Sequence, residues 1–158
     1  MLRLARPGLC CLLTLVAGVA MAADASSSFA PEAWEQGAEG LFGAIRTLEE
    51  ADETVPMVVY FYTDWCGYCR QFERELLGKS KVKSYFEDLL AVRINPEKGD
   101  QERQVAEYYG VNGFPAFFVH SSRSRTLSRV DRMVVENGQP RLKSEDEFLQ
   151  AVEEAAAR

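Results

Sequence analysis

Cysteine and histidine are scarce in this sequence: its 158 residues include four cysteines and one histidine, His120. Two of the cysteines, Cys10 and Cys11, fall in an apolar stretch near the amino terminus. Structural zinc takes four protein ligands, usually cysteine and histidine, so the remaining residues are too few and we expect no metal. A framework of several structural disulfides is excluded by the same count.

Basic residues are also in the minority, with 18 Lys and Arg against 24 Asp and Glu and a formal net charge of -6. No basic stripe runs along the sequence, which argues against a nucleic-acid partner. The length suits one compact domain, and an apolar content of 47% is enough for a hydrophobic core without cross-links.

Long apolar runs are missing except for one from Leu9 to Val19. That run is shorter than the roughly 20 residues that a transmembrane helix needs. It follows Arg3 and Arg6 and precedes Ala20-Met21-Ala22, the order found in a secretory signal peptide. We therefore predict cleavage after Ala22 and a periplasmic or secreted protein; an uncleaved membrane anchor is the alternative.

The predicted domain organisation has three parts: a signal peptide at 1–22, a flexible mature amino terminus at 23–30 and one domain at 31–158. Cleavage leaves Cys66 and Cys69 as the remaining cysteines. A disulfide between them would close almost no loop and would add little stability through chain entropy. The pair therefore requires a chemical explanation.

Apolar periodicity and turn residues predict helices that alternate with strands. The expected elements are a helical region at 31–48 (one helix or two short ones), a strand at 55–63, a helix from Cys66 to a stop at Gly78, a short helix at 82–89, a strand at 90–95, a helix capped by Asp100 and ending at 109, strands at 116–120 and 126–135, a turn at Asn137-Gly138, and a final helix after a Ser144–Glu147 capping box. This order predicts an α/β fold with a mixed central sheet and helices on both faces, in which the last two strands form an antiparallel edge hairpin.

The two cysteines lie where the strand at 55–63 passes into a helix. The thiolate is the reactive form of cysteine, and a helix amino terminus stabilises it through free N–H groups and a partial positive charge. We expect Cys66 to be the exposed attacking sulfur and Cys69 the buried resolving sulfur. Half of a zinc site and an inert structural disulfide remain as alternatives, and we interpret His120 as an ordinary surface residue.

Two motifs carry a resemblance to a known family. The segment Tyr62-Thr63-Asp64-Trp65-Cys66-Gly67-Tyr68-Cys69 resembles the active-site segment of thioredoxin-fold proteins, and Gly113-Phe114-Pro115-Ala116 resembles their cis-proline loop. The resemblance covers roughly 55–135. It implies that Pro115 is cis and lies against the two sulfurs, and that the backbone of Phe114 pairs with an extended substrate segment.

Within this family the chain looks like two periplasmic groups. The Asp-Trp-Cys-x-x-Cys segment looks most like the C-terminal module of transmembrane thiol:disulfide interchange reductases, and the tetrapeptide Cys-Gly-Tyr-Cys looks like that of disulfide isomerases. Three positions depart from thioredoxins: Tyr68 replaces a proline, Tyr60 replaces a buried aspartate, and Arg93 falls where a lysine is usual. The loss of the aspartate predicts slower resolution or another proton acceptor, such as water.

The resemblance also implies the surroundings of the sulfurs. Trp65, Tyr68 and Phe114 would form an apolar contact surface, and Gly67 and Pro115 would shape the site. We therefore expect periplasmic thiol:disulfide exchange on protein substrates, in the reductase or isomerase direction, by a monomer that a membrane thiol–disulfide reductant keeps reduced. The redox-active disulfide would need no cofactor. A dithiol oxidase and a non-catalytic binding or chaperone module remain alternatives.

Overall fold

A computed structural model describes residues 29–50, 55–121 and 126–158. The predicted signal peptide at 1–22, and all but the last two residues of the segment at 23–30, lie outside the described residues. Within the described ranges no helix is long and apolar enough to cross a membrane.

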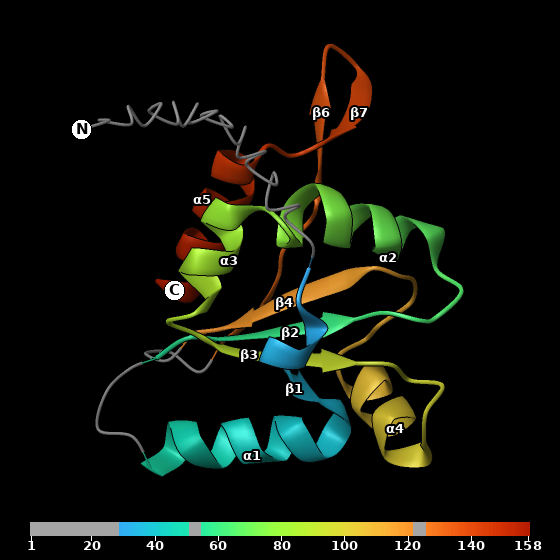
Figure 1. The fold of residues 1–158 in the computed structure, drawn as a ribbon, viewed down its shortest axis with the longest axis vertical. Helices are drawn as coiled ribbons and strands as arrows, with labels where there is room; N and C mark the ends of the chain where they lie inside the picture. Colours follow the sequence, from blue (N-terminus) through green and yellow to red (C-terminus); the bar gives the residue numbers. More distant parts are fainter. Residues whose placement is uncertain (1–28, 51–54, 122–125) are drawn as a thin grey trace, which may run out of the picture.

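A five-stranded sheet forms the centre of the molecule (Figure 1). Its strands, in spatial order, are β1 (Glu35–Gln36), β3 (Leu90–Ile94), β2 (Met57–Phe61), β4 (Ala116–His120) and β5 (Leu127–Arg129). The first three are parallel, whereas β4 runs antiparallel to β2 and β5 antiparallel to β4. All five residues of β2 are buried, because helices cover both faces of the sheet.

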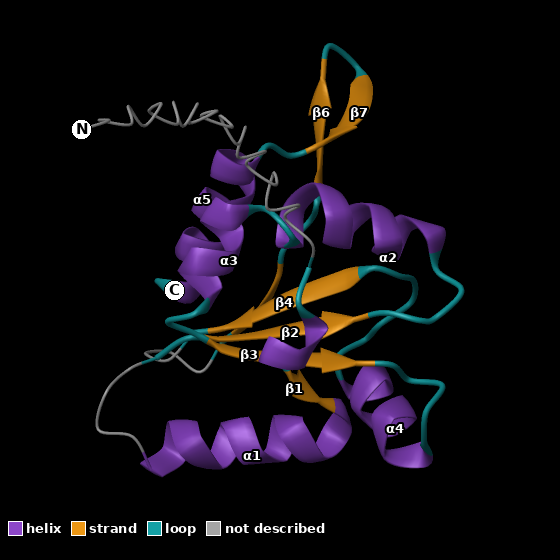
Figure 2. Cartoon of the chain, in the orientation of Figure 1, coloured by secondary structure: helices purple, strands orange, loops and turns teal. Residues whose placement is uncertain are grey.

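The helices divide between the two faces (Figure 2). One face carries α1 (Gly37–Glu50) and α4 (Asp100–Tyr108); the other carries α2 (Gly67–Phe72), its continuation η2 (Glu73–Leu77), α3 (Ser80–Phe86) and α5 (Glu145–Ala156), while the single turn η1 (Pro31–Ala33) precedes β1. This arrangement confirms the predicted mixed sheet with helices on both faces.

Each face of the sheet has its own hydrophobic cluster. The cluster under α2, α3 and α5 is aromatic and includes Tyr60, Phe72, Phe117 and Phe148, together with both cysteines. Trp34 packs edge-on against several of these rings and is 8% exposed, so it belongs to this cluster.

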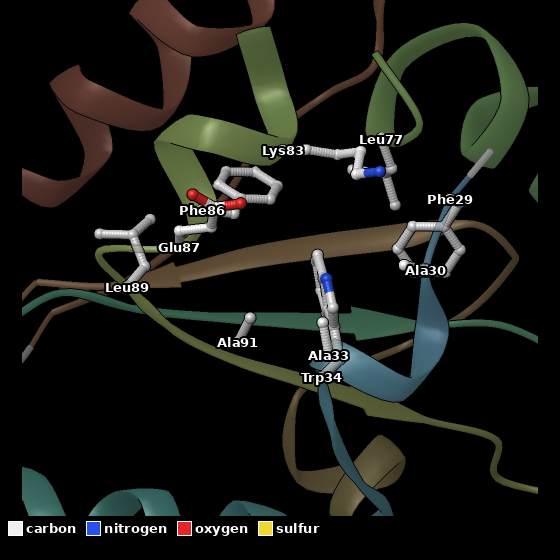
Figure 3. A pocket seen from close by; sticks show the side chains of 10 residues that line it. All are labelled: Phe29, Ala30, Ala33, Trp34, Leu77, Lys83, Phe86, Glu87, Leu89 and Ala91. Carbon is white, nitrogen blue, oxygen red and sulfur yellow. The ribbon is translucent and has the colours of Figure 1, made fainter. Parts of the chain in front are cut away.

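A pocket opens beside Trp34, between the amino-terminal segment and α3 (Figure 3). Phe29, Leu77 and Phe86 are among its lining residues, and neither cysteine is. This pocket is therefore separate from the two cysteines.

Two features before β4, a short strand and a helix cap, differ from the prediction. The helical region at 31–48 contains a short strand, β1, because Glu35 and Gln36 pair with Val92 and Arg93 of β3. Asp100 is the first residue of α4 and not its cap, since Gly99 occupies the N-cap position. A two-residue strand has no local sequence period, so pairing with β3 decides it.

The single strand predicted at 126–135 is wrong. The chain leaves the sheet after Val130, whose N–H donates to the carbonyl of Phe117 at 2.8 Å. Residues Met133–Glu136 form a separate strand, β6, which pairs with β7 (Gln139–Leu142) in a two-stranded hairpin that projects from the body (Figure 1). Asn137 and Gly138, with φ of 52° and 77°, make the predicted turn between them.

Candidate active site

Cys66 is the N-cap of α2, directly after the turn that follows β2. Its N–H donates to the carbonyl of Thr63 at 3.1 Å, and its sulfur accepts the N–H of Cys69 at 3.0 Å. The sulfurs of Cys66 and Cys69 are 2.12 Å apart and form a disulfide. The strand-to-helix junction predicted from sequence is therefore present, with the disulfide at the positive end of the helix.

Cys66 is not the exposed sulfur that the sequence predicts. Cys66 is 3% exposed and Cys69 is 1% exposed, so both residues are buried. The Cys66 sulfur is bonded to Cys69 and also accepts that residue's N–H, so it is turned toward the helix and away from solvent. The nearby residues Trp65 and Tyr68 are exposed to solvent instead, at 66% and 64% of their surface.

The segment before β4 lies beside this junction. Ala116 pairs with Phe61, so the residues that precede β4 and those that follow β2 share one edge of the sheet. The ring of Phe114 meets that of Trp65 edge-on, with centroids 6.3 Å apart, and the Phe114–Pro115 peptide bond is cis. The structure thus brings Phe114 to the Cys66 segment.

Gly67 is not required for space at this site. A Cβ atom built on it would meet only an Arg70 nitrogen at 3.8 Å, an ordinary contact. A shaping role for Gly67 therefore has no steric basis in this structure.

Polar contacts hold the turn before Cys66. The Lys98 ammonium lies 2.7 Å from the Asp64 carboxylate, and it lowers the pKa of that carboxyl below its usual range. The indole N–H of Trp65 donates to Glu97 at 2.9 Å, and Arg70 donates to the carbonyl of Asp64 at 3.1 Å. Trp65 is thereby fixed in orientation although its ring is exposed.

A partly buried carboxylate, Glu73, lies one helical turn after Cys69. Tyr60, in the aromatic cluster that also holds both cysteines, donates its hydroxyl to Glu73 at 3.1 Å. A guanidinium nitrogen of Arg93 lies 3.6 Å from the same Glu73 oxygen, and its guanidinium carbon is 3.8 Å from the ring centroid of Tyr62. The side chains of Arg93 and Glu73 are only 10% and 19% exposed.

Burial and charge set the protonation of these groups. Burial raises the pKa of Glu73, while the hydrogen bond from Tyr60 and the charge of Arg93 oppose that rise. Burial, reinforced by the adjacent Glu73 carboxylate, raises the pKa of Tyr60 well above its ordinary value, so it stays a hydrogen-bond donor.

Glu73 is not among the site residues predicted from the sequence, although a local signal for it exists. Glu73 follows Cys69 by four residues, and its N–H donates to the carbonyl of Cys69, so both side chains share one face of the helical segment. This spacing identifies Glu73 as a carboxylate near Cys69, whereas the prediction named water as the alternative proton acceptor.

Arg132 is a second residue near the cysteines that was not predicted; its guanidinium carbon lies 5.3 Å from the ring centroid of Tyr68. The two residues are far apart in the chain, so no local pattern joins them.

His120 takes no part in the cysteine site. It pairs with Met57 at the end of β4 opposite Pro115, where it is half-buried and hydrogen-bonded to Tyr109. Burial lowers the pKa of its imidazole. No group of three or more potential metal ligands is found among the residues that the structure describes.

Two relatives illustrate the sequence similarity. A mitochondrial thioredoxin domain-containing protein of Schizosaccharomyces pombe is 34% identical over 60% of this chain and 24% of the relative. The thiol:disulfide interchange protein DsbD of Haemophilus influenzae is 31% identical over 54% of this chain and 15% of the relative. The chain therefore spans less than a quarter of the length of these two proteins.

The fold is also found in solved structures. The C-terminal domain of DsbD from Neisseria meningitidis, in its oxidised form, superposes with a TM-score of 0.53 at 22% identity, over 77% of this chain and 98% of that one. A family model described as a thioredoxin-like domain matches residues 41–132. This match spans more than half of the sequence, and the chain belongs to the thioredoxin-like domain family.

Proposed function

We propose that this protein exchanges disulfides with protein substrates through Cys66 and Cys69. The observation that carries the proposal is the Cys66–Cys69 disulfide at the start of α2, beside the segment that ends in Pro115. The similarity to thiol:disulfide interchange proteins supports the same chemistry.

Exchange proceeds in two displacements at sulfur. The Cys66 thiolate attacks one sulfur of a substrate disulfide; the substrate S–S bond breaks, and its other sulfur leaves as a thiolate that takes a proton. Cys69 loses its proton and attacks the Cys66 sulfur, which releases the second substrate thiolate and forms the Cys66–Cys69 bond. Two electrons pass from the dithiol to the substrate, and the reverse sequence oxidises a substrate dithiol.

Glu73 accepts the proton of Cys69 in this proposal. A buried carboxylate four residues along the helix replaces the aspartate whose position Tyr60 occupies. Tyr60 and Arg93 hold Glu73 in place and oppose the effect of burial on its pKa, which keeps the carboxylate available as a base.

Trp65, Tyr68 and Phe114 supply the contact surface for substrate. Trp65 and Tyr68 are exposed on either side of Cys66, and the Phe114 ring closes the Trp65 side. An extended substrate segment lies along the backbone of Phe114, with Pro115 against the sulfurs, and presents its cysteine between the rings.

The proposed setting is the periplasm. The amino-terminal pattern of Arg3, Arg6 and an apolar run ending before Ala20-Met21-Ala22 supports secretion. We infer a monomer that works in the reductase or isomerase direction, without a cofactor, and that a membrane thiol–disulfide reductant keeps reduced.

A trapping experiment tests the exchange. With Cys69→Ser in a secreting bacterial host, resolution is blocked, so disulfide-linked adducts through Cys66 should accumulate in the periplasmic fraction. Non-reducing electrophoresis detects them, and the double variant Cys66→Ser with Cys69→Ser is the control. Folded Cys69→Ser protein without adducts, or adducts equal to those of the control, would contradict the proposal.

The direction of exchange is tested separately, by measuring the equilibrium constant between the Cys66–Cys69 dithiol and glutathione. A reduction potential near that of thioredoxin, about -270 mV, supports a reductase, and one near that of DsbA, about -120 mV, supports an oxidase. The difference decides direction because about 30 mV changes the equilibrium tenfold.

A further inference from the structure

The positive charge of Arg132 lies over the ring of Tyr68, one of the two residues between the cysteines. It lies just before the β6–β7 hairpin, and its guanidinium carbon is 5.3 Å from the ring centroid of Tyr68. Tyr68 is 64% exposed, so the contact forms at the surface next to the disulfide and not in the core.

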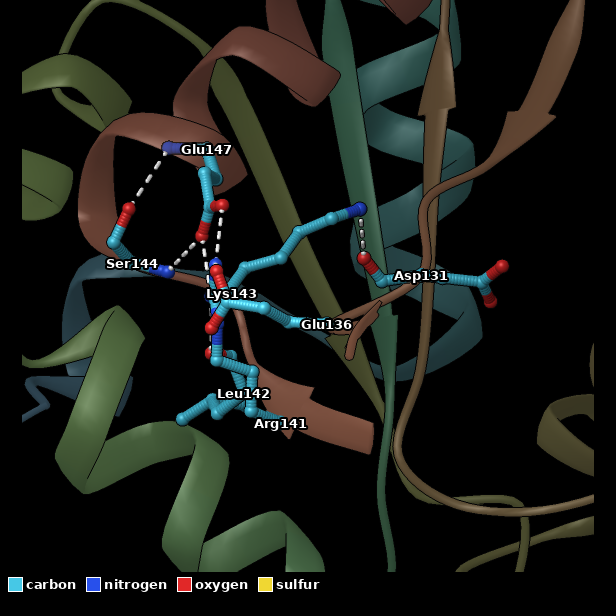
Figure 4. A network of polar contacts seen from close by, with 7 residues as sticks. All are labelled: Asp131, Glu136, Arg141, Leu142, Lys143, Ser144 and Glu147. Atoms are coloured by element: carbon cyan, nitrogen blue, oxygen red, sulfur yellow. Dashed lines mark hydrogen bonds and ion pairs between the residues drawn. The ribbon is translucent and has the colours of Figure 1, made fainter. Parts of the chain in front are cut away.

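The base of the hairpin holds the backbone of Arg132 in position. The N–H of Lys143 donates to the carbonyl of Arg132 at 2.9 Å. The Lys143 ammonium donates to the carbonyl of the preceding residue, Asp131, at 2.7 Å (Figure 4). Two nitrogens of Arg141 reach the two carboxylate oxygens of Glu147, each at 2.7 Å, and tie the hairpin to α5. The backbone around Arg132 is therefore anchored from two sides.

The charge at this base is positive and unbalanced. Arg129, Arg132 and Lys143 stand against one carboxylate, Asp131, which lies 4.0 Å from Arg129. The described residues provide no carboxylate at salt-bridge distance from Arg132 or Lys143; Arg132 donates instead to the sulfur of Met133 at 3.0 Å. In contrast, Arg141 of β7 pairs with two carboxylates, those of Glu136 in β6 and Glu147 in α5.

This local positive charge is opposite in sign to the formal net charge of the whole chain, which is -6. The opposite side of the site, at Trp65, is different: Asp64 pairs with Lys98, and Trp65 donates to Glu97. On the Tyr68 side, a substrate segment at the disulfide therefore meets a guanidinium that has no carboxylate partner among the described residues.

We propose that Arg132, supported by Lys143, selects substrate segments that carry an acidic side chain within a few residues of the reacting cysteine. Arginine binds a carboxylate through a charge-assisted, often bidentate hydrogen bond, and complementary charge also speeds encounter. The inference rests on the proposed exchange function and names its preferred protein substrates: cysteines in acidic sequence.

Matched peptides test this preference. Each peptide carries one cysteine as a mixed disulfide with thionitrobenzoate, whose release is followed by absorbance, and has Glu, Gln or Lys at the flanking positions. At low salt we expect reduced protein to react about two- to fivefold faster with the Glu peptide than with the Gln peptide, and slowest with the Lys peptide, as for an exposed ion pair. Added salt should reduce the differences among the three reaction rates, because it screens exposed charges.

Arg132→Gln should abolish the preference for Glu over Gln, and Arg132→Lys should retain most of it. Arg46→Gln, at an exposed position of α1, changes net charge by the same amount and is the matched control. Equal rates for the three peptides, or equal effects of Arg132→Gln and Arg46→Gln, would overturn the inference.

Exchange of the reduced wild-type protein with a small, uncharged, acyclic disulfide, 2-hydroxyethyl disulfide, keeps the two proposals distinguishable. If this exchange and all peptide reactions are absent, the proposed function fails; if exchange is present without a charge preference, only the selection of acidic segments fails. Circular dichroism of Arg132→Gln and Arg132→Lys confirms that both variants are folded.

Discussion

A tyrosine hydroxyl and a glutamate carboxylate are hydrogen-bonded between β2 and the helical segment that begins at the disulfide. Tyr60 is fully buried, and its hydroxyl would be costly to leave unpaired. Glu73 accepts that hydrogen bond from the helix, and Arg93 supplies the opposite charge. The three residues form one polar group inside an aromatic cluster, so changing one of them changes the protonation of the others.

We expect Glu73→Gln to slow the resolving step by about tenfold or more, because a positioned base contributes to proton transfer. The measurement is the rate at which Cys69 releases a preformed Cys66–peptide mixed disulfide. In the wild type the rate should rise with pH as Glu73 ionises, above the ordinary range of a glutamate because burial raises its pKa. In the variant this rise should be missing.

Glu75→Gln, two residues along the same helical segment, is the matched control and should resolve at the wild-type rate. Tyr60→Phe removes a hydrogen bond that lowers the pKa of Glu73, so the rise in rate should move to higher pH. A Glu73→Gln variant with the wild-type rate and pH profile would rule out Glu73 as the proton acceptor.

The reacting residues were predictable from sequence, whereas their surroundings were only partly so. Spacing identifies Cys66 and Cys69, and the strand-to-helix junction follows from local pattern. The exposure of Cys66 was predicted wrongly, because the direction of its sulfur depends on the bond to Cys69 and the N–H that it accepts. Arg93 is buried because Glu73 and Tyr62 surround it, which no local pattern shows.

At the scale of elements, the β6–β7 hairpin is the main addition to the sheet. Its strands pair only with each other among the described residues, and Val135 is 70% exposed. The Arg141–Glu147 fork and the capping box of Ser144 and Glu147 join it to the start of α5. One carboxylate thus serves both the helix cap and the hairpin anchor.

Acid should weaken this anchor. The guanidinium of Arg141 and the N–H of Ser144 lower the pKa of Glu147 to about 2, below its ordinary value of 4.5. A lowered carboxyl pKa stabilises the fold above the unfolded value and loses that contribution as pH falls from about 4.5 toward about 2. The difference in unfolding free energy between wild type and Glu147→Gln should therefore shrink between pH 6 and pH 3.

Urea denaturation at the two pH values measures this difference. Glutamine keeps an acceptor for the Ser144 N–H, so the comparison isolates the charge. Glu49→Gln, at an exposed position of α1, should show no such pH dependence. A Glu147→Gln difference that stays constant from pH 6 to pH 3 would contradict the assigned anchor.

Element prediction succeeded where the pattern is local. The strand β4, the Asn137-Gly138 turn and the capping box of α5 agree with the prediction. Two features were not predicted. The strand β1 forms because it pairs with β3. The single strand predicted at 126–135 is divided after Val130 into β5 of the central sheet and β6 of the hairpin. Both depend on which neighbour accepts the backbone hydrogen bonds.

The body of the molecule, over the residues that the structure describes, is a five-stranded sheet between two helical layers, and both layers pack on its buried strands. Phe148 of α5 is fully buried and packs edge-on against Phe72 and Phe117, with ring centroids 5.4 and 5.3 Å away. Because β2 and β4 contribute to both hydrophobic clusters, loss of one layer exposes the other.

Phe148→Ala should lower the free energy of unfolding by about 3–5 kcal/mol, through lost burial and the cavity left behind. Phe42→Ala, on an α1 phenylalanine that is 46% exposed, should cost much less. Urea denaturation followed by far-ultraviolet circular dichroism and by tryptophan fluorescence measures both and should give coincident transitions. Two separate transitions, or equal costs for the two variants, would contradict this account of the core.

Local information was sufficient for the alternation of the main helices and strands, the two-cysteine motif at the helix start and the layered α/β architecture. These features depend on neighbouring residues, through side-chain periodicity, capping and turn geometry. Long-range packing was needed to form β1 against β3, to place Glu73 with Tyr60 and Arg93, and to bring Arg132 onto Tyr68. Contacts between distant segments exist only once the sheet has assembled, so the identity of each partner is absent from the local pattern.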